Sequence, residues 1–218
     1  PGLPGLVTLV SRGDETDLQA YGTMTTDGES PMQEDTIFRI ASITKPIVAV
    51  AAMALVEDAT LRLDDPVDSF LPELANRQVL RSMESDLDDT VPAERSISLR
   101  DLLTLTPGYG AIFAAPGTYP IQQAMDDAGL SPSPNAPAMT ADEMLQRYAD
   151  LPLVAQPGTR WLYNNGSDIL GILLARASGM TLGELLQERI FGPLGMVDTA
   201  FSVPAGKADR LPGVYLRD

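Results

Sequence analysis

Ser42-Ile43-Thr44-Lys45 is followed directly by an apolar run from Pro46 to Val56, and the rest of the chain is organised around this stretch. Eleven consecutive apolar residues are too few to cross a bilayer and too many for a surface helix. We expect a helix that is buried on all sides, with Pro46 in its first turn, where a missing N–H is tolerated. Ser42 then stands at the N-terminal end of this helix, and Lys45 lies one turn along on the same face.

The residue composition narrows the chemistry that Ser42 can perform. The chain has no histidine and no cysteine among its 218 residues. A Ser-His-Asp triad, a Cys-His dyad and a zinc site built on either residue are therefore excluded within this chain. If Ser42 is a nucleophile, its base is a lysine, a tyrosine, a carboxylate or a group from another chain. Lys45 and Lys207 are the only lysines, and no metal or organic cofactor is expected.

The formal net charge of −15 limits the kinds of molecule that the protein is expected to bind. Nucleic acids and anionic membrane surfaces are bound through basic patches, so neither is an expected partner. The composition is that of a soluble globular protein, and no apolar run is long enough for a membrane span. Because cysteine is absent, the redox compartment cannot be read from disulfides, and the localisation stays open between the bacterial cytoplasm and the periplasm.

Local patterns predict strands first and helices afterwards. Residues 6–10 and 18–24 are expected to form a hairpin, and residues 36–40 a third extended run. Capping-box patterns at Ser98, Thr140 and Thr181 predict helices that begin directly after each of them. An apolar helix is also expected over residues 167–177. Residues 108–138 are expected to form a long Pro-rich loop with one helical turn near residues 121–127.

A second candidate stretch, Tyr163-Asn164-Asn165, lies between the Pro157-Gly158 turn and the apolar helix. By residue type alone, such a tyrosine is more often a core or rim aromatic than a catalytic group. In a chain without histidine, a tyrosine beside Lys45 can instead share a proton with the amine and so draw the proton from Ser42. The Asn165 amide can hold either a substrate carbonyl or the Lys45 amine.

Several stretches together resemble the serine β-lactamase and penicillin-binding-protein superfamily, in its class C branch, which includes related esterases and D-stereospecific peptidases. The matching stretches follow the family's order: residues 35–46, residues 63–67, residues 71–74, residues 97–104, Tyr163-Asn164-Asn165 and residues 191–196. The resemblance implies an α/β plus all-α fold, in which an antiparallel sheet is flanked by helices and carries an inserted helical region.

The resemblance also implies roles for individual residues. Ser42 is the expected nucleophile, Lys45 and Tyr163 are the proton-transfer pair, and Asn165 positions the substrate. The implied reaction is acylation of Ser42 by a carboxylic ester or a β-lactam amide, followed by attack of water, with the Ser42 N–H as half of an oxyanion hole. The alternative is a non-catalytic module of the same fold that senses a β-lactam or a peptidoglycan fragment. Ester, β-lactam and D-peptide substrates all stay open.

Two features depart from the family pattern. Where members usually carry His-Thr-Ser-Gly, this chain has Leu105-Thr106-Pro107-Gly108. The family's third motif, a Lys or His followed by glycine, has no counterpart here, because Lys207 is followed by Ala208-Asp209. We therefore expect these 218 residues to be the N-terminal part of the active protein, with the remainder of the fold in a second chain. The expected domains are residues 1–57, the strands and nucleophile helix; residues 58–205, mostly helical; and residues 206–218, the start of the return to the sheet.

Overall fold

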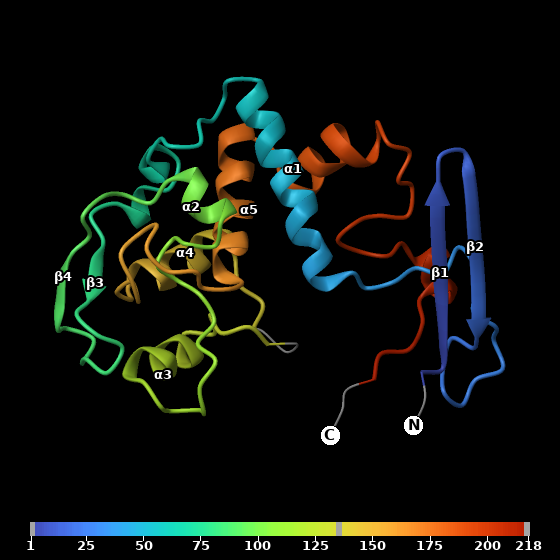
Figure 1. Cartoon of the computed structure of the whole chain (residues 1–218), viewed down its shortest axis with the longest axis horizontal. Coiled ribbons are helices and arrows are strands. Elements are labelled where there is room, and N and C mark those ends of the chain that lie inside the picture. Colours follow the sequence, from blue (N-terminus) through green and yellow to red (C-terminus); the bar gives the residue numbers. More distant parts are fainter. Residues whose placement is uncertain (1–2, 134–136, 216–218) are drawn as a thin grey trace. The chain divides into compact units, whose positions relative to one another are not determined.

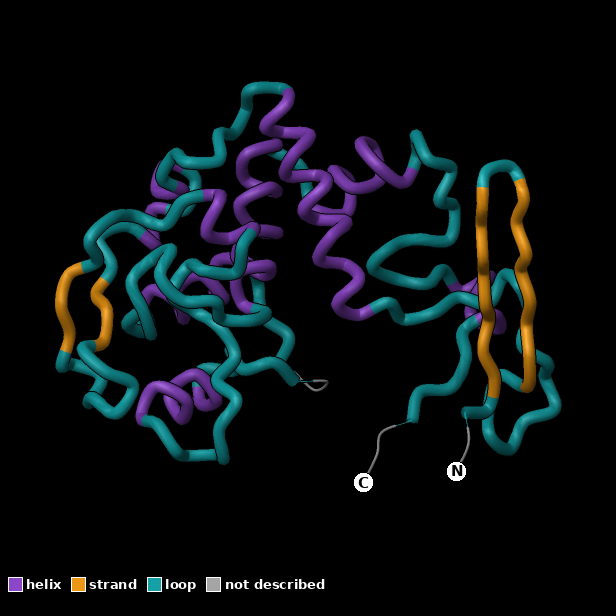
Figure 2. The backbone as a smooth tube through the Cα atoms, in the orientation of Figure 1, coloured by secondary structure: helices purple, strands orange, loops and turns teal. Residues whose placement is uncertain are grey.

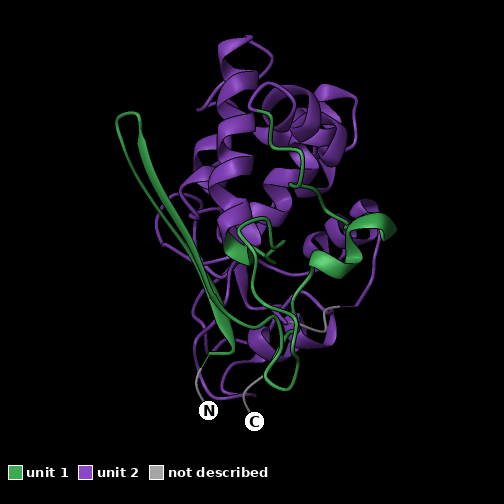
Figure 3. Cartoon of the chain, turned by 90° about the vertical axis from the view of Figure 1, so that its right-hand side faces the viewer, with its two compact units in different colours: residues 1–42, 195–218 green, residues 43–194 purple. Residues whose placement is uncertain are grey.

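The structure is a computed structural model in which residues 3–133 and 137–215 are described. It divides into two compact units, coloured separately in Figure 3: unit 1 is residues 1–42 and 195–218, and unit 2 is residues 43–194. These divisions differ from the expected domains, because the helix that follows Ser42 is grouped with the other helices and not with the hairpin. Residues 134–136 of the Pro-rich loop and residues 216–218 of the expected last segment lie outside the described residues.

Unit 1 contains a β-hairpin formed by β1 (Gly5–Arg12) and β2 (Glu15–Gly22). The strands pair antiparallel, and Gly13 in the turn has a φ of 60°, which glycine adopts without steric cost. The predicted hairpin is thus confirmed. The third extended run is not, because residues 36–40 form no strand; there the Ile37 N–H donates to the Arg210 carbonyl at 2.9 Å.

Charged groups join the two sequence-distant parts of unit 1. Arg210, at the end of the 3-10 helix η5 (Ala205–Arg210), lies 2.7 Å from Asp198 and 3.1 Å from Asp35. Lys207 also contacts Asp198, at 2.6 Å. The hydrogen bonds from Arg210 and Lys207 lower the pKa of Asp198 to about 2. The residues after 195 are therefore tied to the segment that leads to Ser42.

Unit 2 is mainly helical (Figure 1). Its helices are α1 (Thr44–Glu57), α2 (Leu99–Leu103), α3 (Pro120–Asp127), α4 (Ala141–Ala149), α5 (Asn165–Ser178) and α6 (Leu182–Leu186), with the 3-10 turns η2 (Val67–Ser69) and η3 (Pro72–Leu74) and the π-helical turn η4 (Gln187–Phe191). A small antiparallel sheet of β3 (Gln78–Leu80) and β4 (Thr90–Pro92) lies at an edge of unit 2, where it is drawn in orange in Figure 2. The capping boxes predicted at Ser98, Thr140 and Thr181 are all present.

Helix α5 is the central element of unit 2. It packs against α1, α2 and α6, and its side chains at Ile169, Leu173 and Leu174 are fully buried. The sequence predicted this helix over residues 167–177, and it begins two residues earlier. It begins at Asn165, two residues after Tyr163, so the packing of α5 positions the second candidate stretch.

Helix α1 buries one face only, which corrects the expectation of a helix buried on all sides. Val48, Ala51, Ala52 and Leu55 are buried, whereas Val50 is 57% exposed and Met53 is 45% exposed. The reason is that α1 packs on α5, α6 and η4, and these cover one side of it. Pro46 falls in the first turn of α1, as the pattern predicts.

The end of α1 carries an unusual residue. The Thr60 N–H donates to the Leu55 carbonyl at 2.9 Å and the Ala59 N–H to the Val56 carbonyl at 3.0 Å, which is the Schellman arrangement of a helix C-terminus. This motif places its first residue beyond the cap in the left-handed region, usually as glycine. Here that residue is Ala59, with a φ of 58°.

Helix α2 ends in the same way. The Thr106 N–H donates to the Asp101 carbonyl at 2.7 Å, and the Leu105 N–H donates to the Leu102 carbonyl at 3.3 Å. Leu105 is the left-handed residue, with a φ of 59°. A left-handed backbone costs a residue with a Cβ about 1–2 kcal/mol, so the packing around Leu105 has to offset that cost.

None of the described helices is long and apolar enough by itself to cross a membrane, although α5 and the Leu182–Phe191 helix, bent by 81°, meet the length and composition test as a pair. Within residues 3–133 and 137–215, no group of three or more acidic side chains is placed to hold a metal ion.

Candidate active site

The two candidate stretches meet at Lys45. Its Nζ donates a hydrogen bond of 3.0 Å to Oδ1 of Asn164 and lies 4.6 Å from the centroid of the Tyr163 ring. Lys45 is in the first turn of α1, and Asn164 directly precedes α5, so the packing of these two helices brings the residues together (Figure 1). Ser42 lies three residues before Lys45, in the 3-10 turn η1 (Ala41–Ile43). The structure therefore places Lys45 and Tyr163 side by side.

Backbone contacts hold the Tyr163 segment against the loop that follows α2. The Ala111 N–H donates to the Tyr163 carbonyl at 2.7 Å, and the Leu162 N–H donates to the Leu105 carbonyl at 2.8 Å. At Gly110 an added Cβ would lie 2.4 Å from the Cβ of Leu162, so glycine is needed for this close approach. Tyr163 is consequently fixed by the same loop whose sequence departs from the family pattern.

Asn164, whose side chain contacts Lys45, has an unusual backbone conformation. Its φ is 84° and its ψ is −74°, a combination outside the left-handed helical region that is rare and strained for a residue with a Cβ. The Asn164 carbonyl accepts a hydrogen bond of 2.8 Å from the Ser167 N–H, which closes the first turn of α5. The sequence singled out the neighbouring Asn165 and missed Asn164; two consecutive asparagines before a helix were the signal available.

Asn165 occupies a different setting from the one expected. It is fully buried, and its Nδ2 donates to the Leu130 carbonyl at 2.7 Å and to the Tyr148 hydroxyl at 2.6 Å. Its Oδ1 is buried without a hydrogen-bond partner among the described residues. The amide that contacts Lys45 thus belongs to Asn164, and the substrate-positioning role of Asn165 stays a prediction.

Two buried tyrosines, Tyr148 and Tyr109, follow one another in the hydrogen-bonded contacts that begin at Asn165. The Tyr109 hydroxyl donates to the Tyr148 carbonyl at 2.7 Å, and the two ring centroids are 5.0 Å apart. Burial raises the pKa of Tyr109 to about 12 and raises that of Tyr148 further, so both phenols are neutral. Tyr148 supports the start of α5 through the hydrogen bond that its hydroxyl accepts from Asn165, and Tyr109 packs against Tyr148.

Asp168 is a further charged group that the sequence did not single out. Surrounding protein atoms desolvate its carboxyl and raise its pKa, while the positive charge of Lys45 opposes this shift. The residue nevertheless keeps contact with solvent. The interaction of its carboxyl with the charge of Lys45 indicates that Asp168 lies on the side of α5 that faces Lys45.

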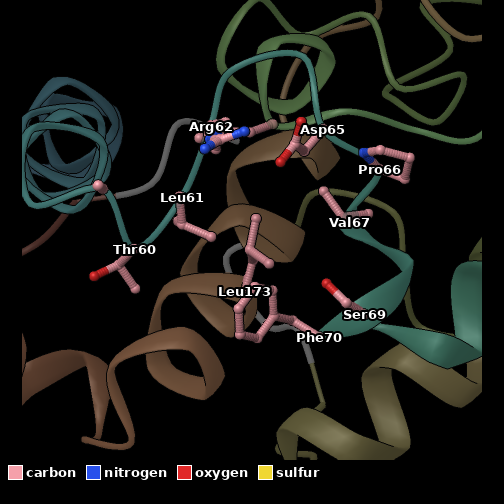
Figure 4. A pocket seen from close by; sticks show the side chains of 11 residues that line it. Thr60, Leu61, Arg62, Asp65, Pro66, Val67, Ser69, Phe70 and Leu173 are labelled. Carbon is pink, nitrogen blue, oxygen red and sulfur yellow. The ribbon is translucent and has the colours of Figure 1, made fainter.

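A cavity of about 180 Å³ adjoins Lys45. It is lined by Lys45, Pro46, Ala49, Leu102, Leu103, Leu105, Ser167 and Leu170. The lining is apolar apart from the lysine and the serine. A larger cavity of about 530 Å³ lies in the segment after α1, where Leu61, Val67, Phe70 and Leu173 form the apolar walls (Figure 4). The larger cavity contains neither member of the Ser42 and Lys45 pair.

Leu105, which lines the cavity beside Lys45, and Asn164, which binds the Lys45 amine, both have a positive φ although neither is glycine. Ala41, which directly precedes Ser42 in the sequence, also has a positive φ, of 42°. Such backbone strain persists where the surrounding structure enforces it, and it is common at functional sites.

A match to the Beta-lactamase family covers residues 1–218, the whole of this sequence. The chain belongs to the beta-lactamase family. The predicted family and the predicted β-lactamase/transpeptidase-like fold are thereby confirmed. Solved structures that share the fold include a class C β-lactamase, with a TM-score of 0.70 at 19% identity.

Relatives within the beta-lactamase family include esterases. Protein Rv1367c of Mycobacterium tuberculosis is 39% identical, with 99% of this chain and 52% of that protein covered. Esterase EstB of Burkholderia gladioli is 36% identical, with 91% and 47% covered. The solved structure of EstCE1, described as a hydrolase with promiscuous acyltransferase activity, gives a TM-score of 0.77 at 28% identity, with 96% of this chain and 51% of that chain covered.

The chain spans about half the length of the curated relatives it matches. The esterases among them support hydrolase-type chemistry in this branch of the beta-lactamase family. The expectation that a separate second chain carries the remainder of the fold stays a prediction.

Proposed function

We propose that this protein is a serine hydrolase that cleaves carboxylic esters through an acyl-enzyme on Ser42. The observation that carries the proposal is the setting of Lys45, which lies three residues from Ser42, 3.0 Å from the Asn164 amide oxygen and 4.6 Å from the centre of the Tyr163 ring. A cation over an aromatic face is attracted to it, and a cationic lysine favours the deprotonated form of a neighbouring phenol. Lys45 and Tyr163 are then the proton-transfer pair.

The proposed reaction has two steps. In the first, the Ser42 Oγ forms a bond to the ester carbonyl carbon, its proton passes to the Lys45 and Tyr163 pair, and the pair returns a proton to the alkoxide as the ester C–O bond breaks. In the second, water adds to the acyl-enzyme, loses its proton to the same pair and displaces the Ser42 oxygen, which takes that proton back. The products are an alcohol and a carboxylic acid, and no cofactor is consumed.

An ester is favoured over a β-lactam as the substrate because the relatives named above include an esterase and a hydrolase with acyltransferase activity. A β-lactam amide is the second substrate class to be tested. The non-catalytic alternative, a module that binds a β-lactam or a peptidoglycan fragment, predicts a Ser42 adduct that does not turn over.

The test is intact-mass spectrometry of the natural protein that contains this chain, after separate incubation with an alkyl fluorophosphonate, benzylpenicillin and a p-nitrophenyl ester. We expect a fluorophosphonate adduct on Ser42, together with continuous release of p-nitrophenol from the ester. Ser42→Ala should lose both, whereas Ser69→Ala, which changes an exposed serine at the larger cavity, should keep both. A permanent penicillin adduct without ester turnover would favour the sensor, and no adduct on Ser42 would contradict both readings.

A further inference from the structure

The larger cavity, of about 530 Å³, lies wholly within unit 2, where residues 59–70 form it together with Leu99 of α2 and Leu173 of α5. Its volume falls in the range of about 300–1,000 Å³ that is usual for small-molecule sites. Its floor is apolar, and Leu61, Val67 and Leu173 converge on the middle of the hollow in Figure 4. All three are buried, as is Leu99, so the floor is part of the core of unit 2.

Backbone hydrogen bonds fix the wall of this cavity against the start of α2. The Val67 N–H donates to the Ile97 carbonyl at 2.9 Å, and the Arg100 N–H donates to the Leu63 carbonyl at 2.8 Å. The residues between α1 and η3 are thereby held in one conformation although they form only one short helical turn. The hollow is therefore preformed, which lowers the entropic cost of filling it with a ligand.

Two opposite charges at one edge of the cavity have no charged partner in the protein. Arg62 and Asp65 both line the cavity, and in the part of the chain that the structure describes neither side chain forms an ion pair or a hydrogen bond. The adjacent Asp64, by contrast, lies 2.6 Å from Arg100. Arg62 and Asp65 are three residues apart in one loop and lie along the same edge in Figure 4. The cavity thus presents one cation and one anion to whatever occupies it.

The Ser69 hydroxyl is a third polar group at the cavity. Figure 4 shows it directed into the hollow, and over residues 3–133 and 137–215 no other group of the protein forms a hydrogen bond with it. A hydroxyl can both donate and accept, whereas the guanidinium of Arg62 only donates and the carboxylate of Asp65 only accepts. An apolar floor with a few polar groups beside it is the usual composition of a small-molecule site.

We infer that this cavity binds a free α-amino acid with a large apolar side chain. The ammonium and carboxylate groups of such a ligand are attached to one carbon, so both can meet the edge that carries Arg62 and Asp65. The guanidinium donates two parallel hydrogen bonds to the carboxylate, and the Asp65 carboxylate accepts from the ammonium group. The side chain of the ligand then covers the apolar floor and removes it from water.

A ligand with only one charge fits this edge less well. A simple carboxylate would pair with Arg62 but lie beside the like charge of Asp65, and a simple amine would meet the converse problem. An amino acid without an apolar side chain would leave the floor exposed to water. The binding site is independent of the proposed ester hydrolysis, because none of its lining residues takes part in that reaction.

The test is isothermal titration calorimetry of the natural protein that contains this chain, with L-phenylalanine as the probe. We expect saturable binding with a Kd of about 1 mM or tighter. Phenethylamine lacks the carboxylate, 3-phenylpropionate lacks the ammonium group and glycine lacks the apolar side chain. Each of these three should bind about 10-fold more weakly or worse, as expected for the loss of a charged hydrogen bond or of the apolar contact.

Variants at the edge of the cavity locate the binding. Arg62→Gln and Asp65→Asn should each weaken the binding of L-phenylalanine by about 10-fold or more. Arg12→Gln and Asp14→Asn are the matched controls, since they change an exposed arginine and an exposed aspartate at the turn of the hairpin, and they should leave the Kd unchanged. All four positions are exposed, so each variant should fold.

The possible outcomes decide the assignment. No saturable binding at up to about 10 mM L-phenylalanine would overturn it. Binding that survives both Arg62→Gln and Asp65→Asn would place the amino acid elsewhere and would also overturn it. Equal affinity for 3-phenylpropionate, lost only in Arg62→Gln, would replace the amino acid with a simple carboxylate. Because ester hydrolysis is not measured, a failure of the proposed function would leave these results unaffected.

Discussion

The Lys45 Nζ donates a hydrogen bond of 3.0 Å to the Asn164 Oδ1, across 119 positions of sequence. The bond ties the first turn of α1 to the residue that precedes α5. It directs the amine toward the segment that carries Tyr163, whose ring centre is 4.6 Å from the same nitrogen. The orientation of the proposed base thus depends on a side chain that stands beside Tyr163 in the sequence.

The first prediction distinguishes the catalytic role of Asn164 from the structural role of Asn165. Asn164→Gly removes the amide and suits the positive φ of 84°, so it should lower kcat for ester hydrolysis by about 10- to 100-fold, as expected for a lost hydrogen bond to a charged group. The melting temperature should stay close to that of the wild type. Asn165→Ala should instead lower the free energy of unfolding by about 1–3 kcal/mol, because it removes buried hydrogen bonds to Leu130 and Tyr148.

Steady-state kinetics and thermal unfolding of both variants check this prediction. The converse pattern, with Asn165→Ala stable but inactive and Asn164→Gly fully active, would assign the substrate-positioning role to Asn165, as the family resemblance implies.

The second prediction concerns the hydroxyl group of Tyr163. Tyr163→Phe keeps the aromatic face 4.6 Å from Lys45 and removes only the hydroxyl. If the hydroxyl transfers the proton, the rate of acylation should fall by about 10²-fold or more, in line with general acid–base catalysis. The rate is measured as the burst of p-nitrophenol in stopped flow, with Tyr21→Phe on the exposed hairpin as the control. An unchanged burst would leave Lys45 as the sole base.

The third prediction tests the cost of the left-handed residue at the end of α1. Ala59 has a φ of 58° in a turn that favours glycine. Ala59→Gly should raise the free energy of unfolding by about 1 kcal/mol, because it removes the steric cost of the Cβ. Ala54→Gly, inside the same helix, should lower it by about the same amount. Urea titration measures both, and equal signs for the two variants would contradict the assigned turn.

The fourth prediction is a pH dependence at the start of α2. Burial by itself raises the pKa of Asp101, but hydrogen bonds from Arg95 and Ser98 outweigh it and hold that pKa below its usual value of 3.8. The folded state therefore favours the ionised carboxylate. The resulting stability is present above the pKa of the unfolded chain, about 3.9, and is lost as the pH falls through the lower pKa of the folded state.

Asp101→Asn should accordingly lower the free energy of unfolding at pH 7 by about 1–3 kcal/mol, since it breaks the ion pair with Arg95 and one arm of the capping box. The difference from the wild type should shrink as the pH falls below about 4. Urea unfolding at pH 7, 5 and 3 provides the measurement. A difference that is constant over this range would show that the charge of Asp101 does not stabilise the fold.

Local sequence was sufficient for the features that depend on a few neighbouring residues. The hairpin follows from two β-rich runs around Gly13, and the helix starts at Ser98, Thr140 and Thr181 follow from side chains that reach only three positions along the chain. The order of several motifs likewise determined the family. Each of these inferences concerns residues whose separation along the chain is already fixed by covalent geometry.

Tertiary structure decided which face of α1 is buried and which asparagine reaches Lys45. Hydropathy shows that Val50 and Met53 are apolar, but only the one-sided packing of α1 on α5 and α6 leaves them exposed. Asn164 and Asn165 are chemically identical, and the turn into α5 sends one amide to Lys45 and the other into the core. The sequence determined which groups are available, while the packing of distant helices determined which of them meet, because their contacts join residues that no local pattern relates.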